Sequence, residues 1–191
     1  MRIAPAFNAP VFDAANAYRA ILSALSRPGT VHDLPAPPDP PAPLSPAMSA
    51  VILTLCDFDT PLWLAPPFAA VRRWCDFHTG APMAEPADAA FAVAPLGAVP
   101  DLTALSPGTD ERPDRSATLV IGCERLGGSD LRLAGPGIDG TTPFASDALS
   151  PKFRAAWAAN GRRFPRGVDV ILCAGTRVAA LSRTTRIVEA G

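Results

Sequence analysis

The chain has 191 residues, of which 48% are apolar and 18% are charged, and its formal net charge is −1. This length predicts a single domain over 1–191, because a chain of this size can bury roughly 70% of its unfolded surface without disulfides or metals. The near-neutral charge excludes non-specific nucleic-acid binding, which needs a basic surplus, and no stretch reaches the ~20 apolar residues of a membrane span.

Four cysteines stand singly in the sequence, without a C-x-x-C pair and without a histidine at metal-ligand spacing. They are Cys56, Cys75, Cys123 and Cys173. Their apolar neighbours predict buried free thiols in a reducing compartment, and the N-terminus lacks the apolar segment of a secretory signal, so we expect a cytoplasmic protein without a metal or cofactor. The low share of charged residues favours an oligomer or a subunit of a complex.

The first predicted element is an amphipathic helix over Phe12–Ser26, with Asp13 as its N-cap. Its apolar face is predicted to carry Phe12, Ala15, Tyr18, Ile21, Leu22 and Leu25. Arg27-Pro28-Gly29 ends this helix, and a short strand over Thr30–Leu34 follows. The segment 35–46 holds seven prolines and predicts a loop or an extended arm, because proline cannot join the interior of a sheet.

Ser45-Pro46 is typical of a helix start, and the apolar run to Cys56 predicts a helix buried on all sides. Further along the chain we expect strands at 62–64, 90–94, 118–123, 130–134, 168–173 and 178–181, and helical segments at 68–77, 100–105 and 150–161. Gly127-Gly128 predicts a hairpin turn that would make 118–123 and 130–134 antiparallel neighbours. Strands interleaved with helices predict an α/β fold, a three-layer α/β/α sandwich with a mixed sheet.

Two groups of side chains are candidates for chemistry. Asp57 and Asp59 could act as a carboxylate pair, although Asp-x-Asp-Thr-Pro is also common turn chemistry. His78, followed by Thr79, could act as a base or a phosphate contact, although a histidine among aromatic residues is often structural.

Arg183-Thr184-Thr185-Arg186 could clamp a phosphate, because guanidinium groups match phosphate oxygens and hydroxyl groups add donors. A second basic group is formed by Arg162, Arg163 and Arg166, and for both groups a solvated surface or an interface with an acidic neighbour is the competing interpretation. The sequence contains no G-x-S-x-G, Walker A or complete dinucleotide-binding motif.

Short pieces along nearly the whole chain match one family in order. They are Asp13-Ala14, Ser26 to Gly29, Leu53 to Leu55, Asp57, Asp59 to Pro61, Trp63-Leu64, Phe77 to Thr79, Ala81-Pro82, Phe91 to Val93, Leu105 to Thr109, Ala117 to Leu119, Leu131 to Leu133, Gly135, Gly137-Ile138, Phe164-Pro165, Gly167, Asp169 and Arg183 to Thr185. In these pieces the chain resembles the PhnH subunit family of the bacterial carbon–phosphorus lyase system. The proline-rich loop and the 140–150 region depart from the family pattern.

The resemblance implies an accessory subunit that works with PhnG, PhnI and PhnJ type subunits in organic phosphonate catabolism. In that system phosphonate and ATP give a ribose 1-phosphonate 5-triphosphate with loss of adenine. The resemblance implies a fold related to the large domain of pyridoxal-phosphate-dependent transferases, without the cofactor lysine. We also expect the isolated chain to form homodimers. Lys152, the sole lysine here, follows Pro151 at a predicted helix start and fits that absence.

Two alternatives remain open from the sequence. In one, the chain is itself a transferase-like component that binds ATP or phosphonate, with Asp57, Asp59, His78, Thr79, Arg183, Thr184 and Thr185 as its contacts. In the other, the chain is a degenerate transferase that binds pyridoxal phosphate non-covalently.

Overall fold

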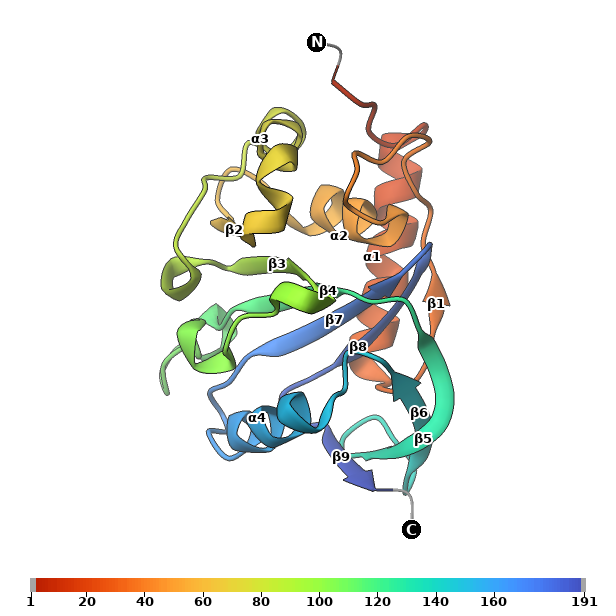
Figure 1. The fold of residues 1–191 in the computed structure, drawn as a ribbon, viewed down its shortest axis with the longest axis vertical. Helices are drawn as coiled ribbons and strands as arrows, with labels where there is room; N and C mark the ends of the chain where they lie inside the picture. Colours follow the sequence, from red (N-terminus) through yellow and green to blue (C-terminus); the bar gives the residue numbers. More distant parts are fainter. Residues whose placement is uncertain (1–2, 190–191) are drawn as a thin grey trace.

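A six-stranded mixed sheet separates the two halves of the molecule, with helices α1–α3 on one side and α4 on the other (Figure 1). The structure is a computed structural model that describes residues 3–189. The helices are α1 (Pro10–Ser26), α2 (Pro46–Leu55), α3 (Arg72–Thr79) and α4 (Pro151–Gly161). The strands are β1 (His32–Asp33), β2 (Leu62–Leu64), β3 (Phe91–Pro95), β4 (Thr118–Gly122), β5 (Leu126–Ala134), β6 (Thr142–Ser146), β7 (Asp169–Ala174), β8 (Arg177–Leu181) and β9 (Arg186–Glu189).

The large sheet has the strand order β1-β8-β7-β4-β3-β2. Strands β2, β3, β4 and β7 run parallel, whereas β8 and β1 pair in antiparallel fashion. The predicted mixed sheet flanked by helices is therefore confirmed. The second face differs from the prediction, because α4 shares it with a separate three-stranded sheet of order β6-β5-β9.

Two hydrophobic cores lie on the two faces of the large sheet. On β4, Val120 packs into the core beneath α1–α3, while Leu119 and Ile121 pack into the core shared with α4. On β7, Ile171 and Leu172 divide in the same way. This alternation follows from strand geometry, in which successive side chains point to opposite faces, and it explains why these strands are apolar throughout.

Helix α1 forms where the sequence predicts it, but its start and its buried face differ from the prediction. Ala9 is the N-cap residue and makes no side-chain cap bond. Asp13 lies one turn inside, where its Oδ2 accepts a 2.9 Å hydrogen bond from the Ala9 backbone N–H. The predicted N-cap role of Asp13 is therefore wrong, although its carboxylate still satisfies an N–H group at the helix start.

The buried residues of α1 are Ala17, Ile21 and Ala24, whereas Tyr18 and Leu22 of the predicted face are exposed. Small alanines let this helix pack closely against α2 and β8, which a face of large side chains would prevent. Of the predicted apolar face, Ile21 is buried and the half-buried Leu25 packs against the core, whereas the larger part of that face is turned toward the surface.

Helix α2 begins at the predicted residues and is buried over most of its length, as predicted. The Ser45 hydroxyl accepts from the Met48 N–H at 3.2 Å, Pro46 is the first helical residue, and every residue from 47 to 52 is buried. The segment 35–45 contains no helix or strand, as its prolines predict, and Leu44 anchors it in the core.

The predicted hairpin between 118–123 and 130–134 is wrong. Strand β4 lies between β3 and β7 in the large sheet, and β5 pairs instead with β6 and β9. Gly127 and Gly128 lie inside β5, where φ values of 93° and 133° accompany an irregular register with β6. A positive φ serves a β-bulge as well as a turn, so the glycine pair does not identify a hairpin.

Within residues 3–189, no helix combines the length and the apolar character needed to cross a bilayer.

Candidate functional site

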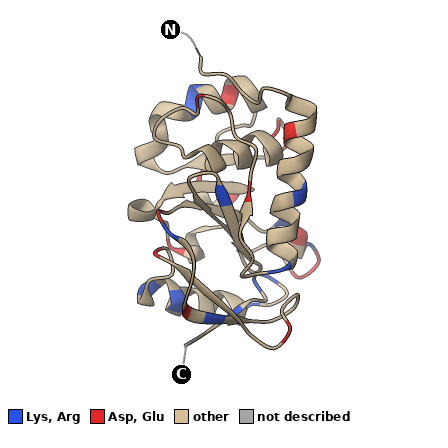
Figure 2. Cartoon of the chain, turned by 90° about the vertical axis from the view of Figure 1, so that its right-hand side faces the viewer, with Lys and Arg blue, Asp and Glu red and all other residues tan. Residues whose placement is uncertain are grey.

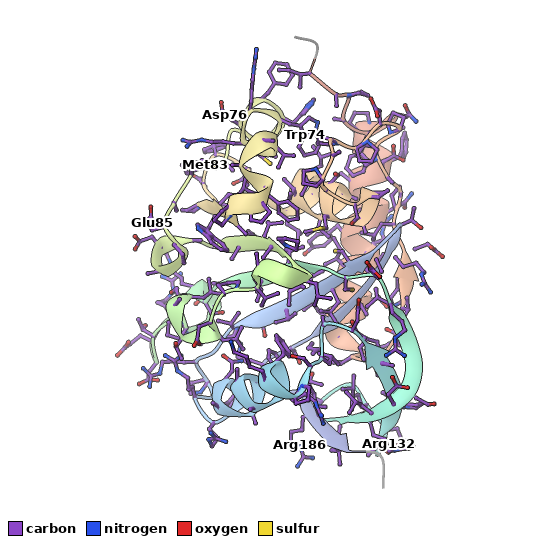
Figure 3. The ribbon with its side chains drawn as sticks, in the orientation of Figure 1. Trp74, Asp76, Met83, Glu85, Arg132 and Arg186 are labelled. Atoms are coloured by element: carbon purple, nitrogen blue, oxygen red, sulfur yellow. The ribbon has the colours of Figure 1, made fainter. Side chains whose placement is uncertain are left out.

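The structure divides the seven predicted site residues between two ends of the molecule. One group belongs to the layer of α2 and α3, and it contains Asp57, Asp59, His78 and Thr79. The other group lies between β8 and β9, beside α4, and it contains Arg183, Thr184 and Thr185. In Figure 3, Trp74 on α3 marks the upper end and Arg186 on β9 the lower end, with the sheet between them. The seven residues therefore do not form one site.

The acidic elbow after α2 is a closed turn. The Asp57 carboxylate accepts from the Asp59 N–H at 2.9 Å and from the Thr60 hydroxyl at 3.2 Å. The Thr60 hydroxyl also accepts from the Asp57 N–H at 2.5 Å. The Asp57 carboxylate therefore stabilises the turn. Among the described residues no hydrogen bond joins it to the carboxylate of the exposed Asp59.

His78 ties the N-terminal segment to α3. Its Nε2 donates to the Ala4 carbonyl at 2.9 Å, and Trp74 Nε1 donates to the same oxygen at 3.0 Å. The imidazole ring also makes edge-to-face contacts with Trp74 and Phe77. These contacts give His78 a structural role at this position.

Thr79 helps to end α3. Its hydroxyl donates to the Cys75 carbonyl at 2.7 Å and accepts from the Ala81 N–H at 3.1 Å. Gly80 follows with a left-handed φ of 68°, the conformation that closes many helices.

Arg183 joins three segments through its guanidinium group. Nε and Nη2 donate to the Asp169 carboxylate, Nη1 donates to the backbone carbonyls of Pro113 and Pro165, and Nη2 also donates to the Ser116 hydroxyl. The Arg183 side chain is only 15% exposed. Its donors therefore face internal oxygens, which leaves little capacity for an external phosphate.

Thr184 and Thr185 are held by the turn that connects β8 and β9. Each hydroxyl lies 3.1 Å from the Ser182 hydroxyl, and the Thr185 carbonyl accepts from Trp157 Nε1 at 2.8 Å. Thr185 is buried. Together with Arg183, these bonds fix the turn through which the chain passes from β8 in the large sheet to β9 in the small sheet.

A groove of about 740 Å³ lies between α4 and β9, next to this turn. Its floor includes Trp157, and its rim carries the exposed arginines Arg162 and Arg186 together with the ring of Phe164. Several of the blue segments in Figure 2 lie in this lower part of the molecule, on α4 and the chain beside it. The sequence indicates both basic groups but misses β9, because four residues with alternating character give only a weak strand signal.

The buried thiols are poor nucleophiles. Burial raises the pKa of Cys75 to about 12 and that of the half-buried Cys123 to about 11. The same desolvation raises the pKa of Cys56 and of Cys173 still further. All four cysteines are free, as predicted, and they stay neutral near pH 7.

Among the described residues, no group of three or more histidine, cysteine or acidic side chains is arranged to hold a metal ion. We take the groove between α4 and β9 as the candidate site, because exposed arginines and the exposed ring of Phe164 line it above the buried Trp157.

The comparisons with known proteins agree along the whole chain. The family model described as "Bacterial phosphonate metabolism protein (PhnH)" matches residues 5–188. The chain is 43% identical over 187 residues to "Alpha-D-ribose 1-methylphosphonate 5-triphosphate synthase subunit PhnH" of Rhizobium meliloti (strain 1021), covering 95% of this chain and 94% of the relative. It is 35% identical over 180 residues to "Putative C-P lyase subunit protein HtxG" of Stutzerimonas stutzeri, covering 90% and 84% of the two chains.

The resemblance inferred from dispersed short pieces is thus confirmed by a family match over residues 5–188. The chain belongs to the PhnH family of bacterial phosphonate metabolism proteins.

Proposed function

We propose that this chain is an accessory subunit of the carbon–phosphorus lyase core complex. It supports the formation of ribose 1-phosphonate 5-triphosphate from phosphonate and ATP, together with PhnG, PhnI and PhnJ type subunits in the cytoplasm. The observation that carries this proposal is the 43% identity, over 95% of the chain, to a relative named as a subunit of a ribose 1-methylphosphonate 5-triphosphate synthase.

The environments of the predicted site residues support an accessory role. His78 and Arg183, the residues best suited to acid–base or phosphate chemistry, both bind internal oxygens. The described thiols are held neutral by their raised pKa values. A subunit of this kind contributes by binding and positioning its partners, while the reacting groups come from them.

The exposed face of α1 supports self-association of the isolated chain. Val11, Tyr18 and Leu22 are 79%, 52% and 51% exposed, and their spacing puts them on one side of the helix. Interfaces between identical subunits are more apolar than ordinary surface, and a helical stripe can pair with its own copy about a two-fold axis. We therefore assign this stripe, defined by Val11, Tyr18 and Leu22, to a homodimer contact.

Reconstitution tests the accessory role. Methylphosphonate and ATP are incubated with purified PhnG and PhnI type subunits, with and without this chain, and released adenine is measured by chromatography. We expect release only when this chain is added to the other subunits, because it completes the assembly. Adenine release by this chain alone, or an equal rate without it, would contradict the proposal.

A second candidate function is direct binding of ATP or phosphonate by this chain. The groove beside Arg162 and Arg186 favours it, because arginine is the residue that most often recognises phosphate groups. Calorimetric titration of the isolated chain with ATP and with methylphosphonate separates this candidate from the first. Saturable heat from either ligand would support the second candidate, and its absence would remove it.

The proposed relation to the large domain of pyridoxal-phosphate-dependent transferases is supported by the parallel strands β2, β3, β4 and β7 between helical layers. Lys152, the sole lysine of the sequence, lies exposed in the first turn of α4.

A further inference from the structure

Strand β9 forms one edge of the small sheet. It pairs with β5 on one side, and in the strand order β6-β5-β9 no further described strand lies on the other. Figure 1 shows β9 between β5 on its right and α4 on its left, so the open edge faces the groove. An edge strand presents backbone N–H and C=O groups that a strand from another chain can pair with.

The groove beside this edge has the apolar contacts that such a strand would use. Val188 on β9 is 43% exposed and Phe164, after α4, is 65% exposed. Both residues line the groove, with Trp157 beneath them. Apolar side chains that are this exposed next to an open strand edge offer pockets for alternate side chains of an added strand.

The charge of the groove identifies the chemistry of its occupant. Arg162 and Arg186 are exposed on its rim, and no ion pair of either is found among residues 3–189. No acidic side chain is among the described residues that line the groove. The whole chain carries a net charge of −1, so this positive groove is a local feature that complements acidic side chains.

We propose that the groove between α4 and β9 binds an extended, acidic segment of a partner subunit, which adds as a strand to the open edge of β9. Backbone hydrogen bonds to β9 supply affinity, apolar side chains of the segment contact Val188 and Phe164, and its carboxylates pair with Arg162 and Arg186. This inference rests on the proposed function, because it names the surface through which the subunit joins the complex.

The arrangement of donors favours an acidic strand over a small phosphate ligand. A phosphate site needs several donors that converge on one point. Arg183, which also lines the groove, donates instead to Asp169, Ser116 and two backbone carbonyls. The Thr185 N–H likewise donates to the Ser182 carbonyl. The exposed cations that remain lie along the rim, which suits carboxylates spaced along a strand.

The experiment compares assembly of this chain and of groove variants with purified PhnG, PhnI and PhnJ type subunits. The test variant is Arg162→Glu with Arg186→Glu. Its control is Arg177→Glu, which reverses an exposed arginine on β8 outside the groove. Circular dichroism and thermal melting establish that each variant is folded before affinity is measured by interferometry.

We expect the double variant to bind about 100-fold more weakly, because each reversed arginine replaces attraction to a carboxylate of the partner by repulsion. This loss of affinity corresponds to about 2.8 kcal/mol. The control should bind like the wild type, and added salt should weaken the wild type more than the double variant. Equal affinity of the folded double variant and the wild type would overturn the inference while leaving the proposed function intact. Failure of the wild type itself to bind would overturn both.

Hydrogen exchange on the wild-type complex provides a second measurement that needs no variant. Backbone amides of 186–189 should exchange more slowly in the complex, because an added strand protects the edge of β9. Unchanged exchange at β9 would overturn strand addition, even if the arginines prove important. Slower exchange of the 186–189 amides on addition of ATP alone, together with unchanged exchange there in the partner complex, would show that a phosphate ligand and not a strand occupies the groove and would overturn the inference as well.

Discussion

At the scale of single residues, Arg183 shows that an arginine suited to phosphate binding can instead hold the fold together through an internal ion pair. In the sequence it begins an Arg-Thr-Thr-Arg run that could clamp a phosphate. In the structure its guanidinium pairs with Asp169 and reaches the carbonyl of Pro113, which connects β7 to the segment before β4. The Arg-Thr-Thr-Arg run is compatible with a phosphate contact and with an internal ion pair. The position of Asp169 in the fold decides for the ion pair.

Arg183→Ala should lower the free energy of unfolding by about 3 kcal/mol, because it leaves the Asp169 carboxylate partly buried without its partner. Urea denaturation followed by circular dichroism measures the change. Arg162→Ala is the matched control, since an exposed arginine at the groove rim should change stability by no more than about 0.5 kcal/mol.

A phosphate-binding Arg183 predicts the opposite result. In that case Arg183→Ala would keep the stability of the wild type and would weaken the binding of ATP or methylphosphonate. That outcome would restore the sequence prediction of a phosphate clamp at this residue.

At the scale of elements, α1 shows that the identity of a helix and the identity of its buried face are separate questions. Large apolar residues suggest the inward side, yet the core accepts Ala17 and Ala24 because α1 packs closely against α2 and β8. The larger Tyr18 and Leu22 are left at the surface as part of the proposed dimer contact. Helix periodicity gives the spacing of a face, whereas the shape of its neighbours selects which face is covered.

The double variant Tyr18→Glu with Leu22→Glu should convert a homodimer into a monomer, because two buried carboxylates would each lose hydration without gaining a partner. Sedimentation velocity measures the change in mass. Asn16→Glu on the exposed opposite flank of α1 is the control and should sediment like the wild type. If the double variant remained dimeric, the contact would lie on another surface.

At the scale of the whole molecule, the large sheet couples its two faces. Trp74 belongs to the core beneath α1–α3, and Trp157 belongs to the core shared with α4. Strands β4 and β7 contribute side chains to both cores. Because the two cores share these strands, neither core can unfold while the other remains folded.

Two variants that each keep one of these tryptophans, with the others changed to phenylalanine, should unfold with the same midpoint in urea. Coincident fluorescence transitions are the result expected of one cooperative unit, as the predicted single domain over 1–191 requires. Trp74 and Trp157 transitions at clearly different urea concentrations would instead reveal two units that unfold separately.

The sequence by itself determined the elements whose signals are local. Ser45-Pro46 and Ser150-Pro151 mark the starts of α2 and α4, because an N-cap hydroxyl and a proline act on their own first turn. Apolar runs located β4, β7 and β8, and the short pieces along the chain identified the PhnH family. The two arginine clusters were also evident, since they can be read directly from the sequence.

Only the tertiary structure decided which strands pair and which side chains remain available. The Gly127-Gly128 pair is compatible with both a hairpin and a bulge. Strand β5 belongs to the second sheet because it pairs with β6, the next strand along the chain, and with β9, which is distant in sequence. For the same reason Arg183 turned inward to Asp169, while Arg186 stayed at the groove. The pairing of β5 with β9 and the ion pair of Arg183 with Asp169 depend on partners distant in sequence, which no local pattern encodes.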